Sequence, residues 1–367
     1  MSKKTPAGWH PPFCPNANCK FHKSLLDDWC YIKFSTYLRK SDNRRIQRYR
    51  CLSCKRTFST QTFSTTYWQK IRGVDAKIFT KTIGGMANRQ IARDLGIDPT
   101  TVNHKLERLG RHCLLYFTQI MMKAPPSRKI VFDGFETFEL SQFFPFHHNV
   151  AVEKDTDLIL FFNDSELRRK GRMTDHQKRR RTELEHKFGR PNPRAIEIAV
   201  AELLSVVIRD EEPVEMFTDD HPQYRIPIRS YGDQIKHFVT SSRDHRDRQN
   251  SLWEVNLFDF VLRHSSANHK RETIAWSKRR QSSTDRLAIF VVWRNFMKGR
   301  REKDRRSPTP AEARGLLARR LKVEDVLSER LFPGHYEIPV SWQAYYWRLV
   351  STRALERERR HTLKYAA

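Results

Sequence analysis

Two close pairs of cysteines near the N-terminus constrain the fold of this chain more than any other feature. Cys14 and Cys19 form the first pair, and Cys51 and Cys54 form the second. Two separated thiolate pairs, each on a tight turn, can close a tetrahedral zinc site, and a ribbon this small needs its metal in order to fold. Four unrelated thiols would not explain two pairs in so short a segment. The sequence therefore predicts a zinc ribbon with one structural Zn²⁺ within residues 1–65.

The remaining residues of this segment leave two questions open. His22 is a possible substitute ligand for the zinc, whereas Cys30 and Cys113 lie outside the pattern and are interpreted as ordinary apolar thiols. The ribbon itself could contact DNA or another protein, and the sequence does not decide between them.

The charge of the chain indicates a polyanionic partner. The 367 residues carry a formal net charge of +27 and a pI near 10.1, and such an excess would make a compact protein repel itself without a polyanion nearby. Double-stranded DNA is the first candidate. No run of about 18 apolar residues could span a bilayer, and no apolar segment follows the N-terminus as in a secretory signal. Six cysteines are too few for a disulfide scaffold in a chain this long, so we expect a reducing cytoplasm and no membrane.

Residues 66–127 predict a small all-α DNA-binding domain. Apolar residues have helical spacing over 76–83 and 90–95, Gly96 ends the second helix, and Asp98 with Pro99 opens a third, which residues 114–122 extend. Two helices joined in this way form a helix-turn-helix, whose second helix reads the major groove. A plain helical hairpin in a core is the alternative. If the segment reads DNA, the contacts come from the start of that helix, at Thr100, Thr101, Asn103, His104 and Lys105.

Residues 128–300 predict an α/β domain. Pro125 and Pro126 break the preceding helix and mark the boundary. Short apolar runs predict strands at 130–133, 148–152, 158–162, 214–218 and 235–239. Helical patterns cover 195–208, 252–263, 266–280 and 287–297. This order of elements suits a ribonuclease-H-like fold.

Three acids stand out in this domain. Asp133 ends the first apolar run with Gly134 behind it, Asp219 ends the fourth, and Glu272 lies on the predicted helix 266–280 in a strongly basic setting. Mg²⁺ prefers carboxylate oxygens, and two divalent ions roughly 3.5–4 Å apart activate the nucleophile and stabilise the leaving oxygen in phosphodiester chemistry. We interpret the acids as one site for two Mg²⁺ or Mn²⁺ ions, in which Asp133 bridges both ions.

Each acid alone is weak evidence. An aspartate at the end of a strand is usually a turn residue, and Glu272 could equally form a surface ion pair. Asp219 and Asp220 are adjacent, so in a strand their side chains point to opposite faces and periodicity does not choose between them.

Two basic regions and the C-terminal region complete the chain. A dense positive run within residues 164–194 predicts an insertion that lies on a phosphate backbone through Arg179, Arg180 and Arg181, with a solvated helix surface as the alternative. Lys278 and Arg279 are further candidate DNA contacts.

Residues 301–367 predict one or two helices. Their aromatic cluster, Trp342, Tyr345, Tyr346 and Trp347, either packs in a core or stacks on unpaired bases.

The segments around the three acids, residues 131–136, 218–224 and 268–280, resemble the DDE transposases of bacterial insertion sequences. The ribbon and helix-turn-helix ahead of them are similar to the arrangement in one branch of that family, so the resemblance covers residues 14–300. It implies a ribonuclease-H-like fold with Asp133, Asp219 and Glu272 as metal ligands, and leaves Asp220 free to cap the following turn. The stretch between Asp219 and Glu272 is longer than in the compact members of the superfamily.

The resemblance predicts a metal-dependent enzyme that binds the ends of a mobile element and cleaves and joins DNA strands. We expect a homo-oligomer on element and target DNA in the bacterial cytoplasm, associated with the nucleoid. Two alternatives remain at this point: a zinc-ribbon and helix-turn-helix regulator without catalysis, and an endonuclease that does not rejoin its products.

Overall fold

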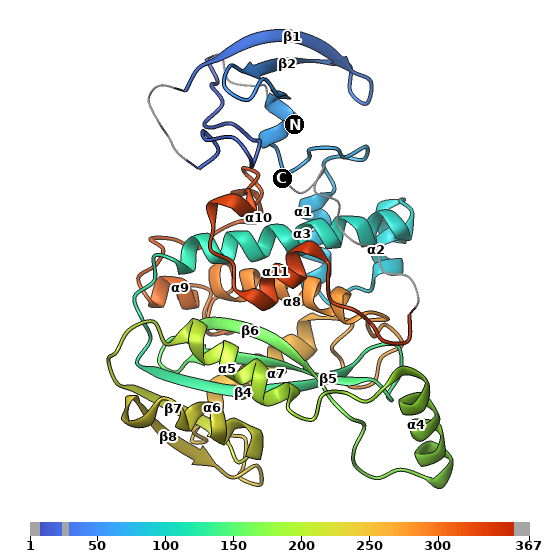
Figure 1. Ribbon diagram of the computed structural model, residues 1–367, viewed down its shortest axis with the longest axis vertical. Coiled ribbons are helices and arrows are strands. Elements are labelled where there is room, and N and C mark those ends of the chain that lie inside the picture. The colour runs from blue at the N-terminus through green and yellow to red at the C-terminus, as the bar shows by residue number, and fades with distance from the viewer. Residues whose placement is uncertain (1–7, 24–28, 356–367) are drawn as a thin grey trace.

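The computed structural model describes residues 8–23 and 29–355, and the chain is layered along its long axis (Figure 1). The N-terminal unit lies at one end, a layer of helices lies in the middle, and a β-sheet with its flanking helices lies at the other end. Within the described residues, no helix is long and apolar enough to cross a membrane.

The N-terminal unit is a three-stranded antiparallel sheet beside the cysteines. Its strands are β1 (Tyr31–Arg39), β2 (Arg44–Cys51) and β3 (Thr57–Ser59), followed by a short 3-10 helix, η1 (Thr60–Phe63). Its core is separate from the rest of the protein and contains buried Cys14, Cys19 and Cys51 with a few aromatic rings. So few apolar side chains bury little surface, which is why a bound metal would matter for the stability of this unit.

The three expected helices of the next segment are α1 (Asp75–Ile83), α2 (Asn88–Leu95) and α3 (Pro99–Met121). Gly96 ends α2 in the left-handed conformation, with φ of 61°, which glycine adopts without steric cost. The Asp98 carboxylate caps α3 by accepting the Thr100 N–H at 2.7 Å. The three predicted helices and the turn at Gly96 between the second and third are present.

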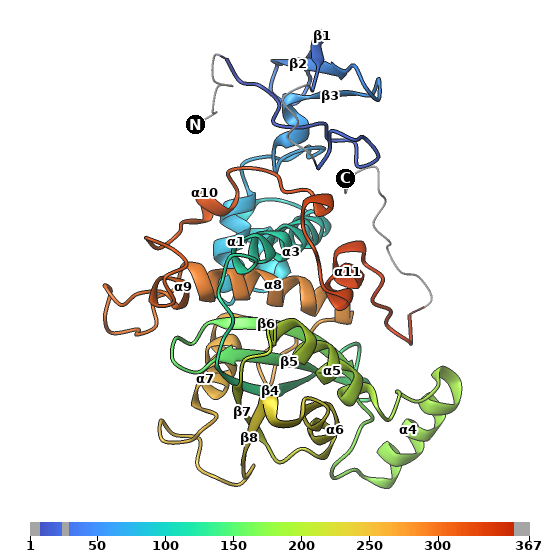
Figure 2. The same cartoon turned by 60° about the vertical axis from the view of Figure 1, so that its left-hand side comes forward.

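The large sheet has five strands in the order β6-β5-β4-β7-β8. Strands β4 (Lys129–Phe138), β5 (Pro145–Glu153) and β6 (Ile159–Glu166) are antiparallel, whereas β7 (Val214–Asp219) and β8 (Ile235–Thr240) run parallel to β4. Helix α5 (Ala195–Val207) packs on β5 and β6, and α7 (Trp253–Ser265) packs on β4 and β5. The two helices cover opposite sides of the sheet (Figure 2). This mixed α/β architecture is compatible with a ribonuclease-H-like fold.

One continuous hydrophobic core joins the helix-turn-helix segment to the sheet. It runs from Ile78 in α1 through α3 and the strands to Tyr345. Helix α3 packs along α8 (Arg280–Phe296) so closely that a Cβ on Gly110 would lie 2.7 Å from the Asp285 Cα atom. The domain boundary predicted near residue 127 is therefore a turn in the chain, and the segments on its two sides share one hydrophobic core.

Two local expectations were wrong. Residues 266–279 are not helical, and α8 begins only at Arg280. The Asn268 side chain donates to the Ser277 hydroxyl at 3.0 Å, and the Thr273 hydroxyl donates to the Ala267 carbonyl at 3.0 Å. Such local bonds compete with helical ones. Asp133 is also not at the end of its strand, because β4 continues to Phe138 in its pairing with β5.

The shorter elements connect these parts. Helix α4 (Asp175–Phe188) projects from the body, and η2 (Pro222–Tyr224), α6 (Arg225–Arg229) and η3 (Gly232–Gln234) link β7 to β8 (Figures 1 and 2). The C-terminal region contains α9 (Pro310–Ala313), α10 (Val323–Val326), η4 (Pro333–His335) and α11 (Val340–Trp347).

The aromatic cluster of α11 packs in the core. Trp342 is buried, stacks on Phe161 with ring centroids 5.3 Å apart, and donates its indole N–H to the Phe162 carbonyl at 2.7 Å. Tyr345 and Tyr346 are buried as well. The packing interpretation is confirmed for these three residues, and their burial removes them as platforms for unpaired bases.

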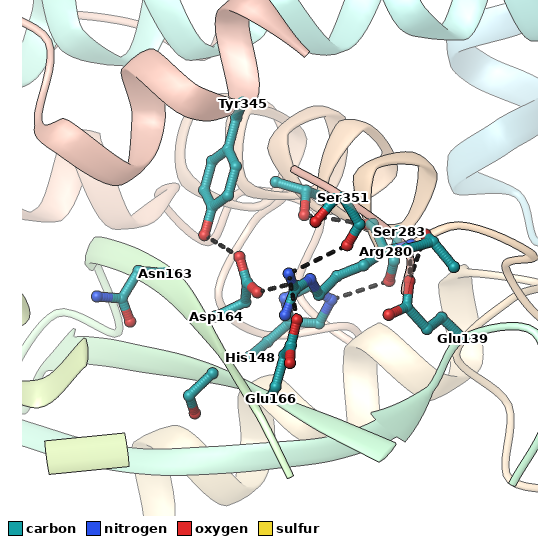
Figure 3. A network of polar contacts seen from close by, with 12 residues as sticks. Glu139, His148, Asn163, Asp164, Glu166, Arg280, Ser283, Tyr345 and Ser351 are labelled. Atoms are coloured by element: carbon teal, nitrogen blue, oxygen red, sulfur yellow. Dashed lines mark hydrogen bonds and ion pairs between the residues drawn. The ribbon is translucent and has the colours of Figure 1, made fainter. Parts of the chain in front are cut away.

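A buried polar network around Arg280 fastens the C-terminal region to the sheet (Figure 3). The Arg280 guanidinium pairs with Asp164 at 3.1 Å and with Glu166 at 3.0 Å on β6. The Arg280 backbone N–H and the Thr352 hydroxyl both donate to Glu139, at 2.7 and 2.6 Å. Burying these charges is tolerable only because each has partners, and the paired and buried Arg280 therefore has a structural role.

Candidate active site and metal centre

The four cysteines form a site of the size that zinc requires. Their sulfur atoms all lie within 4.8 Å of one another, with Cys14 Sγ 3.6 Å from Cys54 Sγ and Cys19 Sγ 3.9 Å from Cys51 Sγ. A tetrahedron with Zn–S bonds of about 2.3 Å has edges of roughly 3.8 Å. Because a disulfide is only about 2.05 Å long, these spacings fit thiolates around an ion. The cluster can bind zinc through the predicted ligands.

The surroundings of the cysteines favour a thiolate at one of them. Burial opposes ionisation of Cys51, but N–H groups of Cys54, Ser53 and the Trp29 indole outweigh it and lower the pKa of Cys51 to about 7. The indole nitrogen lies 3.3 Å from Cys51 Sγ. Burial raises the pKa of Cys14, a penalty that a bound cation would offset.

The other candidates near the ribbon have different roles. The His22 Nδ1–H donates to the Cys14 carbonyl at 2.8 Å, so this histidine supports the turn and is not among the grouped ligands. Cys113 is buried as expected, but the interpretation of Cys30 as an apolar buried thiol was wrong, because Cys30 is exposed.

Asp133 and Asp219 are brought together by the register of two parallel strands. β4 pairs with β7 through Val131 opposite Phe217, and the strands part beyond that point. Two residues further along each strand lie Asp133 and Asp219, which therefore occupy the same face at the opening between the strands. Their carboxylates accept backbone N–H bonds from Gly134 at 2.7 Å and from His221 at 3.0 Å.

The two carboxylates lie close enough to disfavour ionising together. Burial, followed by the charges of Asp219 and Asp259, raises the pKa of Asp133 to about 8. Burial also raises the pKa of Asp219. Closely spaced acids with raised pKa values are typical of a site that binds a cation.

Asp259 is a third acid at this site that the sequence analysis missed. It lies on α7, one turn before Arg263, whose guanidinium lies 4.3 Å from the centre of the Phe135 ring. Phe135 follows Asp133 by two residues on β4, so α7 covers the face of the sheet that carries Asp133. Burial raises the pKa of Asp259 to about 7 although Arg263, Arg246 and Arg271 lower it. The sequence does contain a sign of this role, because Asp259 is the single acid within the apolar run 257–262.

Glu272 lies outside this arrangement. It is exposed on the irregular loop 266–279 and makes no ion pair with any residue that the structure describes. Its neighbour Arg271 acts electrostatically on Asp259, so the loop passes beside the acids. Within the described ranges, no three carboxylates have oxygen atoms that all lie within 4.8 Å of one another, as the ligands of one metal ion would.

The adjacent Asp220 is exposed and does not cap the turn that follows. The His221 side chain caps η2 instead, accepting the Gln223 N–H at 3.3 Å, while Asp219 accepts the His221 N–H. The expectation of a cap at Asp220 was therefore wrong.

Four of the five predicted groove-reading residues lie on the outer side of α3. Thr100, Asn103 and His104 are exposed, and Thr101 is half-buried. Lys105 points inward, where its ammonium pairs with Asp75 at 3.2 Å and donates to the Ile71 carbonyl at 2.6 Å. Assigning Lys105 to DNA was therefore wrong, because its charge is already satisfied inside the protein.

The basic candidates are placed differently from one another. Arg179 and Arg180 are exposed on α4, which buries none of its residues, whereas Arg181 is half-buried and donates to the Arg169 carbonyl at 3.0 Å. Lys278 is exposed and lies 3.2 Å from the centre of the Trp276 ring. Arg279 is half-buried at the start of α8.

Comparison with known proteins adds little. No family model matches the chain, and no curated protein matches it. One similar solved structure is the simian T-cell lymphotropic virus intasome in complex with the PP2A regulatory subunit B56 gamma, with 13% sequence identity over 65% of this chain and 74% of that chain. Its TM-score of 0.24 is too low to support an argument about this protein.

Proposed function

We propose that this protein is a DDE-type transposase, which binds the ends of a mobile DNA element and catalyses metal-dependent strand cleavage and strand transfer. The observation that carries the proposal is the juxtaposition of Asp133 and Asp219 where β4 and β7 separate. Burial, followed by the charges of neighbouring acids, raises their pKa values, and a bound divalent cation would offset both effects. The strand order and the charge of +27 are in keeping with a ribonuclease-H-like enzyme that acts on DNA.

Asp133 and Asp219 would hold Mg²⁺ or Mn²⁺, which activates a water or a 3′-hydroxyl and stabilises the leaving oxygen. For the third ligand we favour Asp259, because it lies on the helix that covers Asp133, whereas Glu272 would need its loop to move. Arg246 acts electrostatically on Asp133, Asp219 and Asp259, and it is placed to hold a phosphate beside them.

The DNA would be held by surfaces on both sides of this site. We assign base reading to Thr100, Thr101, Asn103 and His104 at the start of α3, and phosphate contacts to Arg179, Arg180, Arg181, Lys278 and Arg279. The four cysteines of the N-terminal unit would hold one structural zinc. Assembly as a homo-oligomer on DNA, in a bacterial cytoplasm, belongs to the same proposal.

The decisive assay is cleavage of a labelled element end with Mg²⁺, run beside a binding gel. Asp219→Asn should abolish cleavage and leave DNA binding intact, whereas the adjacent control Asp220→Asn should keep both activities. Full cleavage by Asp219→Asn would remove this strand end from the metal site. A protein that binds but never cleaves would be a regulator, and one that cleaves without joined products would be an endonuclease.

The third ligand is tested in the same assay. If Asp259 holds the metal, Asp259→Asn should lose cleavage while Glu272→Gln retains it. The reverse result would restore Glu272, and would mean that the loop 266–279 moves toward the acids when DNA and metal bind.

A further inference from the structure

A cluster of arginines lines a cavity on the side of α3 that faces the C-terminal region. The cavity lies between α3, the segment 65–75 and residues 327–346, and its cationic walls are Arg108, Arg111 and Arg330. It offers about 60 Å³ to the centres of water-sized molecules, whereas roughly 10–15 Å³ is enough for one water. A tetrahedral oxyanion therefore fits inside it.

The charge in this cavity is poorly compensated. Neither Arg108 nor Arg111 forms an ion pair with a carboxylate in the part of the chain that the structure describes. Asp75 is the one acid on the wall, and Lys105 already pairs with it at 3.2 Å. Asp285 is within electrostatic reach of Arg111, but its carboxylate is bonded to Arg348 at 2.8 Å.

The hydrogen bonds of these arginines single out Arg111. Arg108 donates to the Tyr67 carbonyl at 2.7 Å, and Arg330 donates to the Thr62 carbonyl at 3.0 Å. These bonds fasten the segment that links the N-terminal unit to α1. The Arg111 side chain makes no such bond within the described ranges, although Arg111 is only 8% exposed and lines the cavity. The Arg111 guanidinium therefore depends on whatever occupies the cavity for its hydrogen-bond acceptors.

We propose that this cavity is a binding site for a phosphate-bearing ligand, held by Arg111 together with Arg108 and Arg330. Guanidinium groups match phosphate oxygens in geometry and charge, and converging arginines are the usual way in which a protein holds such a group. Arg108 and Arg330 also donate to backbone carbonyls of the segment that connects the N-terminal unit to α1. A bound ligand would therefore restrict the movement of that segment as well. The inference is independent of the proposed transposase activity.

The test is thermal unfolding of the full-length protein in chloride and in inorganic phosphate at equal ionic strength. Phosphate should raise the melting temperature saturably, and Arg111→Met should weaken phosphate binding at least tenfold. In chloride, Arg111→Met should unfold no lower than the native protein, because the Arg111 guanidinium makes no hydrogen bond or ion pair with the described residues that the variant would lose. The control Arg229→Met removes the same charge from the exposed end of α6, a position without any role in the proposed DNA contacts, and should keep the full phosphate response.

Two results would overturn the site. An unchanged phosphate response in Arg111→Met would place phosphate elsewhere on the basic surface, and an equal loss of stability in both buffers would make Arg111 a structural residue. Parallel titrations with thymidine 5′-monophosphate and with a diester-linked thymidine dinucleotide distinguish a free phosphate from a backbone phosphate as the preferred ligand.

Discussion

Replacing Asp133 with asparagine should make the protein more stable while removing its proposed activity. The substitution is nearly isosteric, and the asparagine carbonyl oxygen can still accept the Gly134 N–H that Asp133 accepts at 2.7 Å. What changes is the charge, because an asparagine does not ionise beside Asp219 and Asp259.

The sign of the effect follows from proton binding. Burial and the neighbouring acids raise the pKa of Asp133 to about 8 in the folded protein, whereas it is about 3.9 in an unfolded chain. Between these values the folded state holds a proton that the unfolded state has released. The native protein therefore loses stability as the pH rises from about 4 to about 8. Asp259, with its pKa raised to about 7, acts in the same direction.

The size of the effect can be bounded. One pKa unit corresponds to about 1.4 kcal/mol, so the full shift from about 3.9 to about 8 sets an upper limit of roughly 6 kcal/mol. Asp133 keeps some contact with solvent, and the charge of Asp219 acts on it, so part of the shift would be redistributed between the two acids. We therefore expect about 2 kcal/mol of added stability for Asp133→Asn near pH 7.5. The difference should disappear near pH 4, where the folded native protein holds the proton.

Urea unfolding at several pH values measures this difference. The buffer must lack magnesium but also lack strong chelators, since these would remove zinc from the cysteines. Asp220→Asn is the matched control and should change stability far less, because Asp220 is exposed and its charge is only a lesser cause of the raised pKa of Asp219. Magnesium should then stabilise the native protein but not Asp133→Asn. A variant that is less stable than the native protein near pH 7.5 would refute the reasoning.

Three further predictions concern the metal and the DNA. The double variant Cys51→Ser/Cys54→Ser should contain no zinc by metal analysis and should lose the fold of the N-terminal unit; stoichiometric zinc in it would exclude the site. Thr101→Ala and Asn103→Ala should each weaken end-specific binding by about 1–3 kcal/mol while leaving nonspecific binding unchanged, and unaffected specific affinity in a binding gel would place base reading elsewhere. Replacing residues 179–181 with alanine should lower the salt slope of DNA binding by about one unit per lost phosphate contact, and an unchanged slope would mean that α4 is only a solvated surface.

The sequence alone determined those features that depend on short-range spacing. The cysteine pairs, the turn at Gly96 with the cap at Asp98, and the five apolar strands each involve a few neighbouring residues whose backbone geometry follows from local chemistry. The two aspartates at β4 and β7 were identified for the same reason, because each follows a recognisable buried run.

Only the tertiary structure decided which distant side chains meet. Lys105 fits a groove-reading position by its spacing, yet Asp75 and the Ile71 carbonyl hold it inside the protein. Glu272 fits a helical pattern, yet local side-chain bonds from Asn268 and Thr273 keep its segment irregular.

Asp259 lies near Asp133 and Asp219 because α7 packs across the face of β4. Arg111 lines a cavity because α3 packs against residues that lie more than two hundred positions later in the chain. Helix packing and strand register bring such pairs together at no fixed sequence separation, and the electrostatic cost of placing like charges side by side exists only once the chain has folded.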